Sequence, residues 1–145
     1  MDIKHTYLVD LKWEEGRKGI ISSPDLNDSI EVVTPPEFPK GIERIWSPEH
    51  LFVAAVESCF MTTFLAVAEN SKLDFENLSA RATGVLEKVD KRFMITEIDL
   101  HVTLEIRDSL QKERAIRILE KSEEVCLISN SVKTKINFVP TVVIK

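Results

Sequence analysis

A single stretch, residues 47–70 (SPEHLFVAAVESCFMTTFLAVAEN), constrains the fold most, because it can form one long apolar helix. Ser47 can cap this helix, Pro48 suits its first position, and Glu49 brings a carboxylate to the positive end of the helix dipole. Residues 51–68 are apolar around most of the helix circumference, which indicates burial on several sides. A helix of this length spans roughly 30–35 Å, so we expect the other elements to pack around it.

Length and composition favour one ordinary globular domain, residues 1–145. A chain of 145 residues can bury a sizeable core, and its apolar and charged fractions, 43% and 30%, are typical of globular proteins. The formal net charge of -5 argues against a nucleic-acid partner, because binding to phosphate requires a basic surface.

The sequence favours a cytoplasmic protein that does not cross a membrane. The apolar helix approaches the length of a membrane span, but Glu57, Ser58, Thr62 and Thr63 interrupt it and no second apolar span follows. The first residues are polar and lack the pattern of a signal peptide. Two cysteines without a targeting segment fit a reducing compartment better than a secreted disulfide scaffold.

The segments before the long helix predict short strands and loops. Rough alternation of apolar and polar residues indicates strands at 3–13, 20–22 and 30–34. Gly16 and Gly19 flank Arg17 in a turn that can hold a cation at its tip. The Pro-rich segment 35–41 cannot be a helix or a central strand, so we expect an extended loop that leads into the helix.

The segments after the long helix predict further strands and a second helix. Strand character appears at 78–89, 93–106 and 135–144, with a hairpin turn at 90–92. Residues 109–129 return to helical spacing, and Pro140 makes the last strand an edge strand or marks a bulge. The order β-β-β, long α, β-β, α, β predicts an α+β fold with antiparallel sheets packed around a long central helix.

Both cysteines fall on the expected inner faces of the helices. Cys59 lies in the middle of the long helix, within a stripe of small residues that lets another element approach the sulfur. Cys126 lies on one helical face together with Ala115, Leu119 and Ser122. If the two helices pack together, the sulfurs could meet as a dithiol. The spacing alone leaves two interpretations open: the two cysteines are ordinary packing residues, or they form a reactive pair.

A reactive cysteine needs a nearby cation or helix N-terminus to stabilise its thiolate. Arg17 is the cation in a distinctive turn, and Glu49 is the carboxylate best placed to hold a guanidinium in a two-pronged pair. Taken alone, Arg17 and Glu49 are equally well explained as ordinary surface charges, and the Glu49 carboxylate then only stabilises the start of the helix.

Other kinds of site find less support. His5, His50 and His101 lack the tight spacing of metal ligands, and the cysteines form no C-x-x-C motif. Because the C-x-x-C motif is absent, the sequence also disfavours a protein that only exchanges thiols and disulfides and does not react with peroxides. A non-enzymatic alternative stays open, namely a dimeric binding or redox-sensing protein that carries a small apolar ligand at its interface.

The sequence resembles the osmotically inducible protein C / organic hydroperoxide resistance (OsmC/Ohr) family, from about Trp13 to Val143. The motifs that carry the resemblance are GRKG, the Pro-rich loop, SPEHLFVAAVESCF and, much later, VCLISNSV. In that family the helix motif reads approximately S-P-E-x-L ahead of the first cysteine. The second cysteine there begins a C-P-x-S-like segment near the end of the chain.

The resemblance implies a thiol-dependent peroxidase that reduces hydroperoxides, preferentially organic ones in many members. By this resemblance Cys59 is the peroxidatic cysteine and Cys126 the resolving one, so that oxidation ends in an intramolecular Cys59–Cys126 disulfide. Arg17 corresponds to the arginine that stabilises the thiolate and orients the peroxide, and Glu49 to the carboxylate that holds this arginine.

The resemblance also implies an OsmC/Ohr-like fold in an intertwined homodimer, with apolar active sites at the subunit interface. No metal, haem or flavin is required, and an external dithiol, such as a lipoyl group on a protein, reduces the disulfide.

Some residues depart from the family pattern or add to it. Leu127 stands where the family commonly has proline, which could change the shape of the chain at Cys126 and the rate of resolution. Arg44 lies close to Glu49 in sequence and is therefore a rival or additional cation. The candidates for the apolar lining, each equally well explained by core packing, are Phe38, Ile45, Trp46, Phe52 and Phe60.

Overall fold

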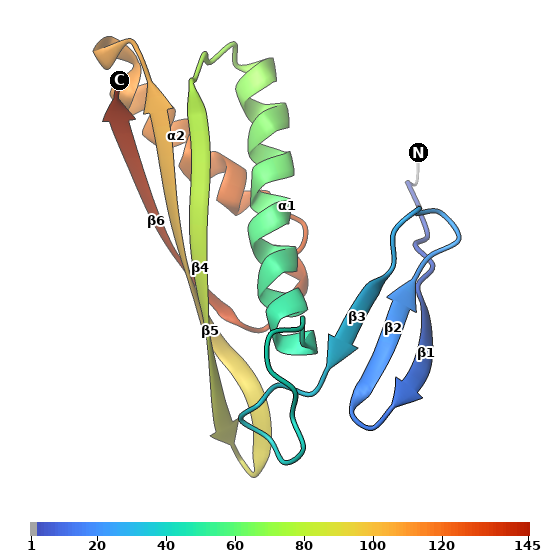
Figure 1. The fold of residues 1–145 in the computed structure, drawn as a ribbon. Helices are drawn as coiled ribbons and strands as arrows, with labels where there is room; N and C mark the ends of the chain where they lie inside the picture. Colours follow the sequence, from blue (N-terminus) through green and yellow to red (C-terminus); the bar gives the residue numbers. More distant parts are fainter. Residues whose placement is uncertain (1–2) are drawn as a thin grey trace. The chain divides into compact units, whose positions relative to one another are not determined.

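The computed structural model describes residues 3–145. Its elements are, in chain order, β1 (Asp10–Glu15), β2 (Lys18–Ser22), β3 (Ile30–Val33), α1 (Pro48–Asn70), β4 (Asn77–Val89), β5 (Arg92–Ile106), the 3₁₀ helix η1 (Ser109–Gln111), α2 (Lys112–Glu124), the 3₁₀ helix η2 (Ser129–Ser131) and β6 (Lys135–Ile144). Figure 1 shows these elements, and their order is the one predicted from the sequence. The fold is of the α+β class.

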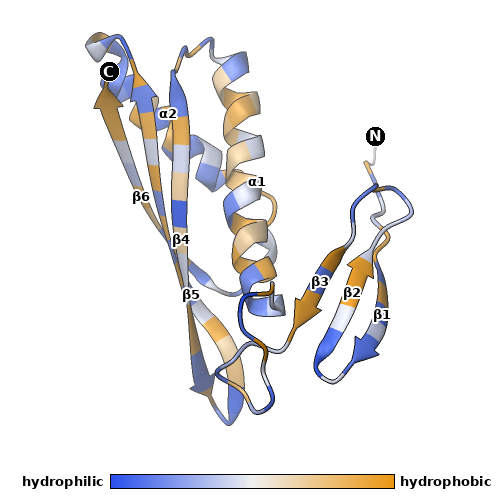
Figure 2. Cartoon of the chain, viewed as in Figure 1, coloured by the Kyte–Doolittle hydropathy of each residue, from blue (hydrophilic) through white to orange (hydrophobic). Residues whose placement is uncertain are grey.

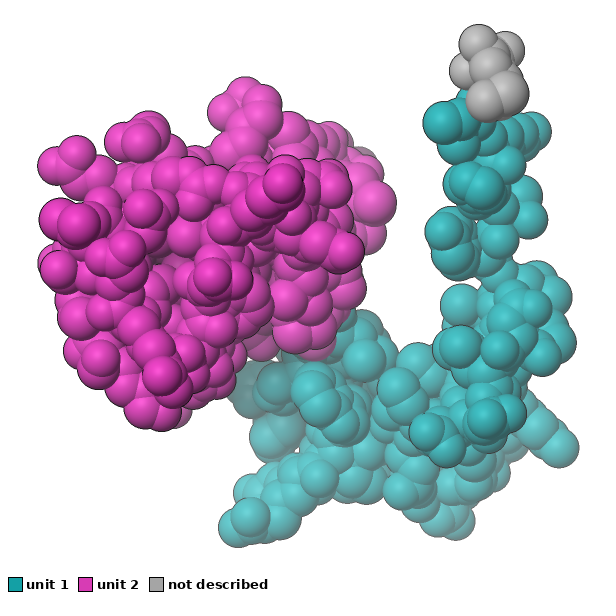
Figure 3. Space-filling view, turned by 90° about the horizontal axis from the view of Figure 1, so that it is seen from above, with its two compact units in different colours: residues 1–51 teal, residues 52–145 magenta. Residues whose placement is uncertain are grey.

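The chain divides into two compact units, residues 1–51 and residues 52–145, which Figure 3 colours separately. The first unit contains β1, β2, β3 and the Pro-rich loop, and the second contains most of α1 and every later element. The prediction that residues 1–145 form a single domain stays a prediction.

The first unit is built on a three-stranded antiparallel sheet in the order β1-β2-β3. β1 begins at Asp10, whereas the sequence predicted a strand from residue 3. The difference arises because Asp10 pairs with Ser22, the last residue of β2, so earlier residues run past the end of their partner strand. Gly16 has a φ of 50°, a left-handed conformation that glycine adopts without strain, and it forms the tight turn before β2.

The start of α1 is capped as predicted. The Ser47 hydroxyl accepts a hydrogen bond from the backbone N–H of His50 at 3.1 Å, and the Ser47 carbonyl accepts one from Leu51 at 3.0 Å. Ser47 is fully buried, and its Oγ lies 2.7 Å from His50 Nδ1. The segment 35–41 ahead of it contains no helix or strand, also as predicted.

The second unit contains a three-stranded sheet in the order β4-β5-β6. β4 and β5 form a long antiparallel hairpin, and its turn residues Asp90 and Lys91 both have positive φ values, which suit the twist of the flanking strands. β6 is an edge strand, as Pro140 indicated. However, β6 runs parallel to β5, so the prediction of purely antiparallel sheets is wrong here. A helix, α2, connects the two strands, and such a crossover returns the chain in the parallel direction.

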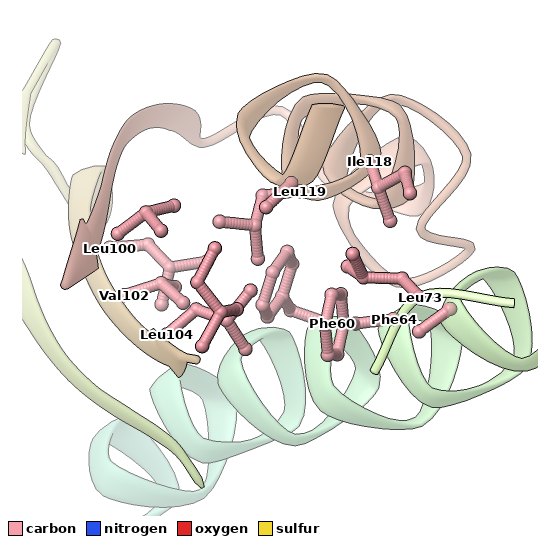
Figure 4. Packing of buried hydrophobic residues seen from close by; sticks show 12 residues of the cluster. Phe60, Phe64, Leu73, Leu100, Val102, Leu104, Ile118 and Leu119 are labelled. Carbon is pink, nitrogen blue, oxygen red and sulfur yellow. The ribbon is translucent and has the colours of Figure 1, made fainter. Parts of the chain in front are cut away.

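One face of this sheet, covered by both helices, forms the core. The residues of β5 alternate between this face and solvent, and its inward side chains are at most 1% exposed: Ile98, Leu100, Val102, Leu104 and Ile106. Figure 4 shows three of them, Leu100, Val102 and Leu104, meeting Phe60 and Phe64 of α1 and Leu119 of α2. The core therefore fixes α1, β5 and α2 against one another.

α1 is buried within this chain on one side only. Phe60 and Phe64 lie in the core, whereas Met61 and Leu65 are 44% and 43% exposed. Figure 2 shows apolar residues along most of α1, interrupted by a few hydrophilic ones. The prediction of burial on several sides is thus wrong for the single chain. By length and composition α1 could also span a membrane, and one of its sides is buried in the mixed helix–sheet core.

Candidate active site

Cys59 occupies the buried side of α1. Its side chain is 8% exposed, and its sulfur lies 3.9 Å from the hydroxyl oxygen of Thr63, one helical turn further on. Thr62 donates a hydrogen bond to the Cys59 carbonyl at 3.0 Å, so this hydroxyl is engaged by the helix backbone. The sulfur therefore sits on a regular helix that the core holds in place.

Cys126 lies two residues beyond the end of α2, not on the helix as the spacing predicted. α2 ends at Glu124, whose carbonyl accepts a hydrogen bond from the Asn130 side chain at 3.2 Å. The Cys126 N–H donates to the Glu123 carbonyl at 3.2 Å, and its own carbonyl accepts from the Asn130 N–H at 3.0 Å. This tight turn still directs the side chain inward, because Cys126 is fully buried.

The two cysteines are free thiols that lie close together. Burial is the main cause that raises the pKa of the Cys126 thiol, and the neighbouring Cys59 raises it further. The backbone N–H and the hydroxyl of Ser129 act in the opposite direction. The structure thus brings together two sulfurs from distant segments, as the dithiol hypothesis requires, and keeps Cys126 protonated at neutral pH.

Two polar residues beside Cys126, Glu123 and Ser129, were not singled out from the sequence. Burial raises the pKa of the Glu123 carboxyl, and the Ser129 hydroxyl lowers it. Glu123 Oε2 and Ser129 Oγ are shielded from solvent, yet neither makes a hydrogen bond of ordinary geometry within residues 3–145. The available signal was their spacing, three residues before and three after Cys126, because such positions return to the same side of a turn.

Arg17 and Glu49, both in the first unit, line one depression of about 280 Å³ together with Phe38 and residues 32–35. Arg17 is exposed in the turn between β1 and β2, as predicted. No ion pair between Arg17 and Glu49 occurs in the described part of the chain, so the expected two-pronged pair is not formed here. Glu49 Oε1 is buried without a hydrogen-bond partner among these residues, which leaves the carboxylate available to a donor.

Arg44, the rival cation, lies elsewhere in the first unit. It lines a separate cavity of about 600 Å³ with Trp46 and His50, and Glu49 is not among the lining residues. Arg44 also has a positive φ of 68°. Within this unit the structure therefore groups Glu49 with Arg17 rather than with Arg44.

The residues considered for an apolar lining divide between cavities and core. Phe38 lines the depression beside Arg17, while Ile45 and Trp46 line the cavity beside Arg44. Phe60 is 1% exposed and stacks on Phe64 at a centroid distance of 6.2 Å, so it is a core residue. Among residues 3–145 no group of three or more His, Cys, Asp or Glu side chains is arranged to hold a metal ion.

Comparisons of the sequence with family models and with known proteins agree on one family. The family model described as OsmC-like protein matches residues 41–140. An uncharacterized protein, YmaD of Bacillus subtilis, is 24% identical over 134 residues, which cover 89% of this chain and 87% of that protein. An organic hydroperoxide resistance protein-like protein of Staphylococcus aureus strain USA300 is 27% identical over 122 residues, 84% of each chain.

Solved structures share the fold. An OsmC-like protein of unknown function from Vibrio cholerae, VCA0330, superposes with a TM-score of 0.80 at 23% identity, covering 97% of this chain and 100% of that one. An organic hydroperoxide resistance protein from Elizabethkingia anophelis gives a TM-score of 0.78 at 24% identity, with both chains fully covered. The chain described here, with its two buried thiols, belongs to the family of OsmC-like proteins.

Proposed function

We propose that the protein is a cysteine-based peroxidase that reduces organic hydroperoxides. The single observation that carries the proposal is the pair of free, buried thiols, Cys59 and Cys126, held beside each other from segments far apart in the sequence. The name of the Staphylococcus aureus relative, organic hydroperoxide resistance protein-like, points to the same substrate class.

The chemistry requires no metal, haem or flavin. The Cys59 thiolate attacks the O–O bond of the hydroperoxide, forms a sulfenic acid and releases the alcohol once the departing oxygen takes a proton. Cys126 then attacks the sulfur of the sulfenic acid, which yields a Cys59–Cys126 disulfide and water. An external dithiol, such as a protein-bound lipoyl group, reduces the disulfide and completes the cycle.

Arg17 and Glu49 complete the proposed site. In this proposal Arg17 stabilises the Cys59 thiolate and orients the peroxide, and Glu49 holds Arg17. Their shared depression and the unpartnered Glu49 oxygen support the pairing of Glu49 with Arg17. The protein works as an intertwined homodimer in the cytoplasm, and the exposed apolar side of α1, which includes Met61 and Leu65, supports a second copy as its cover.

Titration of free thiols tests the proposal. The wild-type protein should lose both thiols on addition of one equivalent of cumene hydroperoxide, and should react more slowly with hydrogen peroxide. Cys59→Ser should consume no hydroperoxide, and an excess of dihydrolipoamide should restore the thiols of the wild type. If the wild type keeps its thiols and instead binds apolar compounds saturably, with Cys59→Ser binding equally well, the non-enzymatic alternative holds.

A further inference from the structure

A further cavity lies in the unit of residues 52–145, at a distance from Cys59. Its volume is about 830 Å³, within the range of small-molecule sites. It is lined by residues 72–76 after α1, by residues 106–108 at the end of β5, and by Gln111 and Arg114 around the start of α2. Figure 1 shows that α1 ends and β4 begins at the same end of this unit. Cys59 lies roughly 16 Å along the helix axis from Asn70, the last residue of α1.

Arg114 is a partly buried arginine that is fixed in place beside this cavity. Its guanidinium donates one hydrogen bond to the side-chain oxygen of Gln111 at 3.1 Å and another to the backbone carbonyl of Ser71. Both acceptors are neutral, so they orient the guanidinium without neutralising its charge. A guanidinium carries more N–H groups than these two contacts use, so donors remain for a third partner.

No carboxylate balances the charge of Arg114. This side chain takes part in no ion pair within the part of the chain that the structure describes. The Glu76 carboxylate is engaged by Arg107, whose Nε lies 2.6 Å from Glu76 Oε1. The Asp108 carboxylate accepts the backbone N–H of Leu110 at 2.9 Å. A charged group that is withdrawn from water without a counterion costs free energy, and a bound anion would remove this cost.

Lys72 and Asp74 are the other charged residues beside the cavity. Neither forms an ion pair among residues 3–145, and both are exposed, so water screens their charges far better than that of Arg114. Lys72 has a φ of 55° just after α1, a left-handed conformation for which glycine is the usual residue. A lysine here adds a second cation to the cavity wall. Arg114 is therefore the charge that most needs a partner.

The cavity also has an apolar part. Leu73, Phe75 and Ile106 line it, and all three belong to the hydrophobic core or pack against it. A ligand with a short apolar chain would cover these side chains while its charged head meets Arg114. A carboxylate suits the head, because its two oxygen atoms match the planar fork of a guanidinium.

We propose that this cavity binds a small organic carboxylate with an apolar chain, and that Arg114 donates hydrogen bonds to its head group. The site is separate from the proposed peroxidase chemistry, because none of Cys59, Cys126, Arg17 and Glu49 lines the cavity. A chain that binds the carboxylate but does not react with hydroperoxides would contradict the proposed function and leave this inference intact.

Titration of sodium hexanoate into the ¹⁵N-labelled full-length protein tests the inference. Hexanoate should bind saturably, with one molecule per chain, and should shift the amide signals of residues 72–76 and 106–111 together. Acetate should bind about tenfold more weakly or worse, because the burial of the apolar chain is lost. Hexanol keeps the chain but has no charge, and should also bind about tenfold more weakly or worse.

Matched variants identify the cation. Arg114→Gln keeps an amide donor but not the charge, and should weaken hexanoate binding by about 10- to 100-fold, the usual loss for a hydrogen bond to a charged group. Arg114→Lys should recover part of the affinity, because it keeps the charge without the planar fork. Arg117→Gln is the control and should bind as the wild type does, because Arg117 is exposed on the same helix and does not line the cavity.

Urea unfolding of each variant separates loss of binding from loss of the fold, since Arg114 also joins α2 to the end of α1 through Ser71. If Arg114→Gln does not fold, the comparison of hexanoate with hexanol in the wild type decides the question without any substitution. The absence of saturable hexanoate binding, or equal affinity in the wild type and folded Arg114→Gln, would overturn the inference. Binding that Arg17→Ala abolishes would place hexanoate at the proposed peroxide site and would overturn it as well.

Discussion

The two compact units differ in how well each buries its apolar side chains. In residues 52–145, Phe64 and Leu119 have no exposed surface and lie in a core built from two helices and a sheet. In residues 1–51, every residue of β1 is exposed, and Leu11 and Trp13 are each 72% exposed. A three-stranded sheet with so little burial gains little stability from its own contacts.

This difference separates two parts of the proposed chemistry. The thiols belong to the unit with the packed core, where their positions are set by α1 and the turn after α2. Arg17 and Glu49 belong to the sparsely packed unit, in an open depression without a mutual ion pair. The two sulfurs lie together within one chain, whereas no ion pair joins Arg17 to Glu49 in the described residues, and we propose that a second copy supplies further contacts to this pair.

The largest expected effect concerns the thiol pair. Cys126→Ser should lose all catalytic turnover with a dithiol, because no resolving thiol remains, but should still reduce one equivalent of hydroperoxide. The product should be a sulfenic acid on Cys59 that a dimedone probe captures and mass spectrometry localises. Continued turnover at the wild-type rate would mean that Cys126 has no role as the resolving cysteine.

A stability measurement sharpens the contrast between the units. Phe64→Ala removes a fully buried ring and should cost about 3–5 kcal/mol of the free energy of unfolding in urea. Leu11→Ala should cost less than about 0.5 kcal/mol if its side chain is as exposed in solution as in the single chain. A cost above about 1 kcal/mol for Leu11→Ala would show that a partner covers β1.

Arg17 should control the rate of the first step. Removal of a cation beside a thiolate typically changes its ionisation by one to two orders of magnitude, so Arg17→Ala should slow sulfenic acid formation by about 10- to 100-fold. Arg17→Lys should recover part of the lost rate, because lysine keeps the positive charge. Recovery should be incomplete, because an ammonium ion lacks the planar fork of the guanidinium. Arg44→Ala serves as the control, and an equal loss in Arg44→Ala would reassign the cation.

The smallest effect concerns the pH dependence of stability. A carboxyl group with a raised pKa holds its proton more tightly in the folded than in the unfolded chain, so its contribution to stability is lost as the pH rises through the raised value. Glu123→Gln cannot ionise and should therefore gain stability relative to wild type between about pH 4 and pH 7. Urea midpoints at both pH values, with Glu124→Gln as the reference, measure this gain. An equal difference at both pH values would contradict it.

Much of the fold was predictable because local signals were strong. Ser47 and Pro48 marked the start of α1, near-regular alternation marked β5, and Pro140 marked β6 as an edge strand or a bulged one, of which the structure shows the edge strand. The errors concern long-range partners. The start of β1 depends on where β2 ends, and the parallel direction of β6 depends on the α2 crossover. The burial of α1 on one side only could not be inferred from the sequence, because apolar residues occur on both sides of this helix.

The candidate site was predictable in part. Helical spacing directed Cys59 and Cys126 inward, although Cys126 lies past the end of α2, where the Asn130 side chain caps the helix. Glu123 could not be identified, because a glutamate on a charged helix resembles a solvated surface residue until the following turn is known. The missing Arg17–Glu49 ion pair likewise depends on side-chain geometry that sequence spacing does not contain.

The most direct test of the account is the intact mass of the wild-type protein after one equivalent of cumene hydroperoxide, measured without reductant. The account predicts that each chain loses the mass of two hydrogen atoms, and that digestion yields one peptide pair in which Cys59 is joined to Cys126. Chains that keep both thiols, or that form disulfides only between two copies, would contradict it.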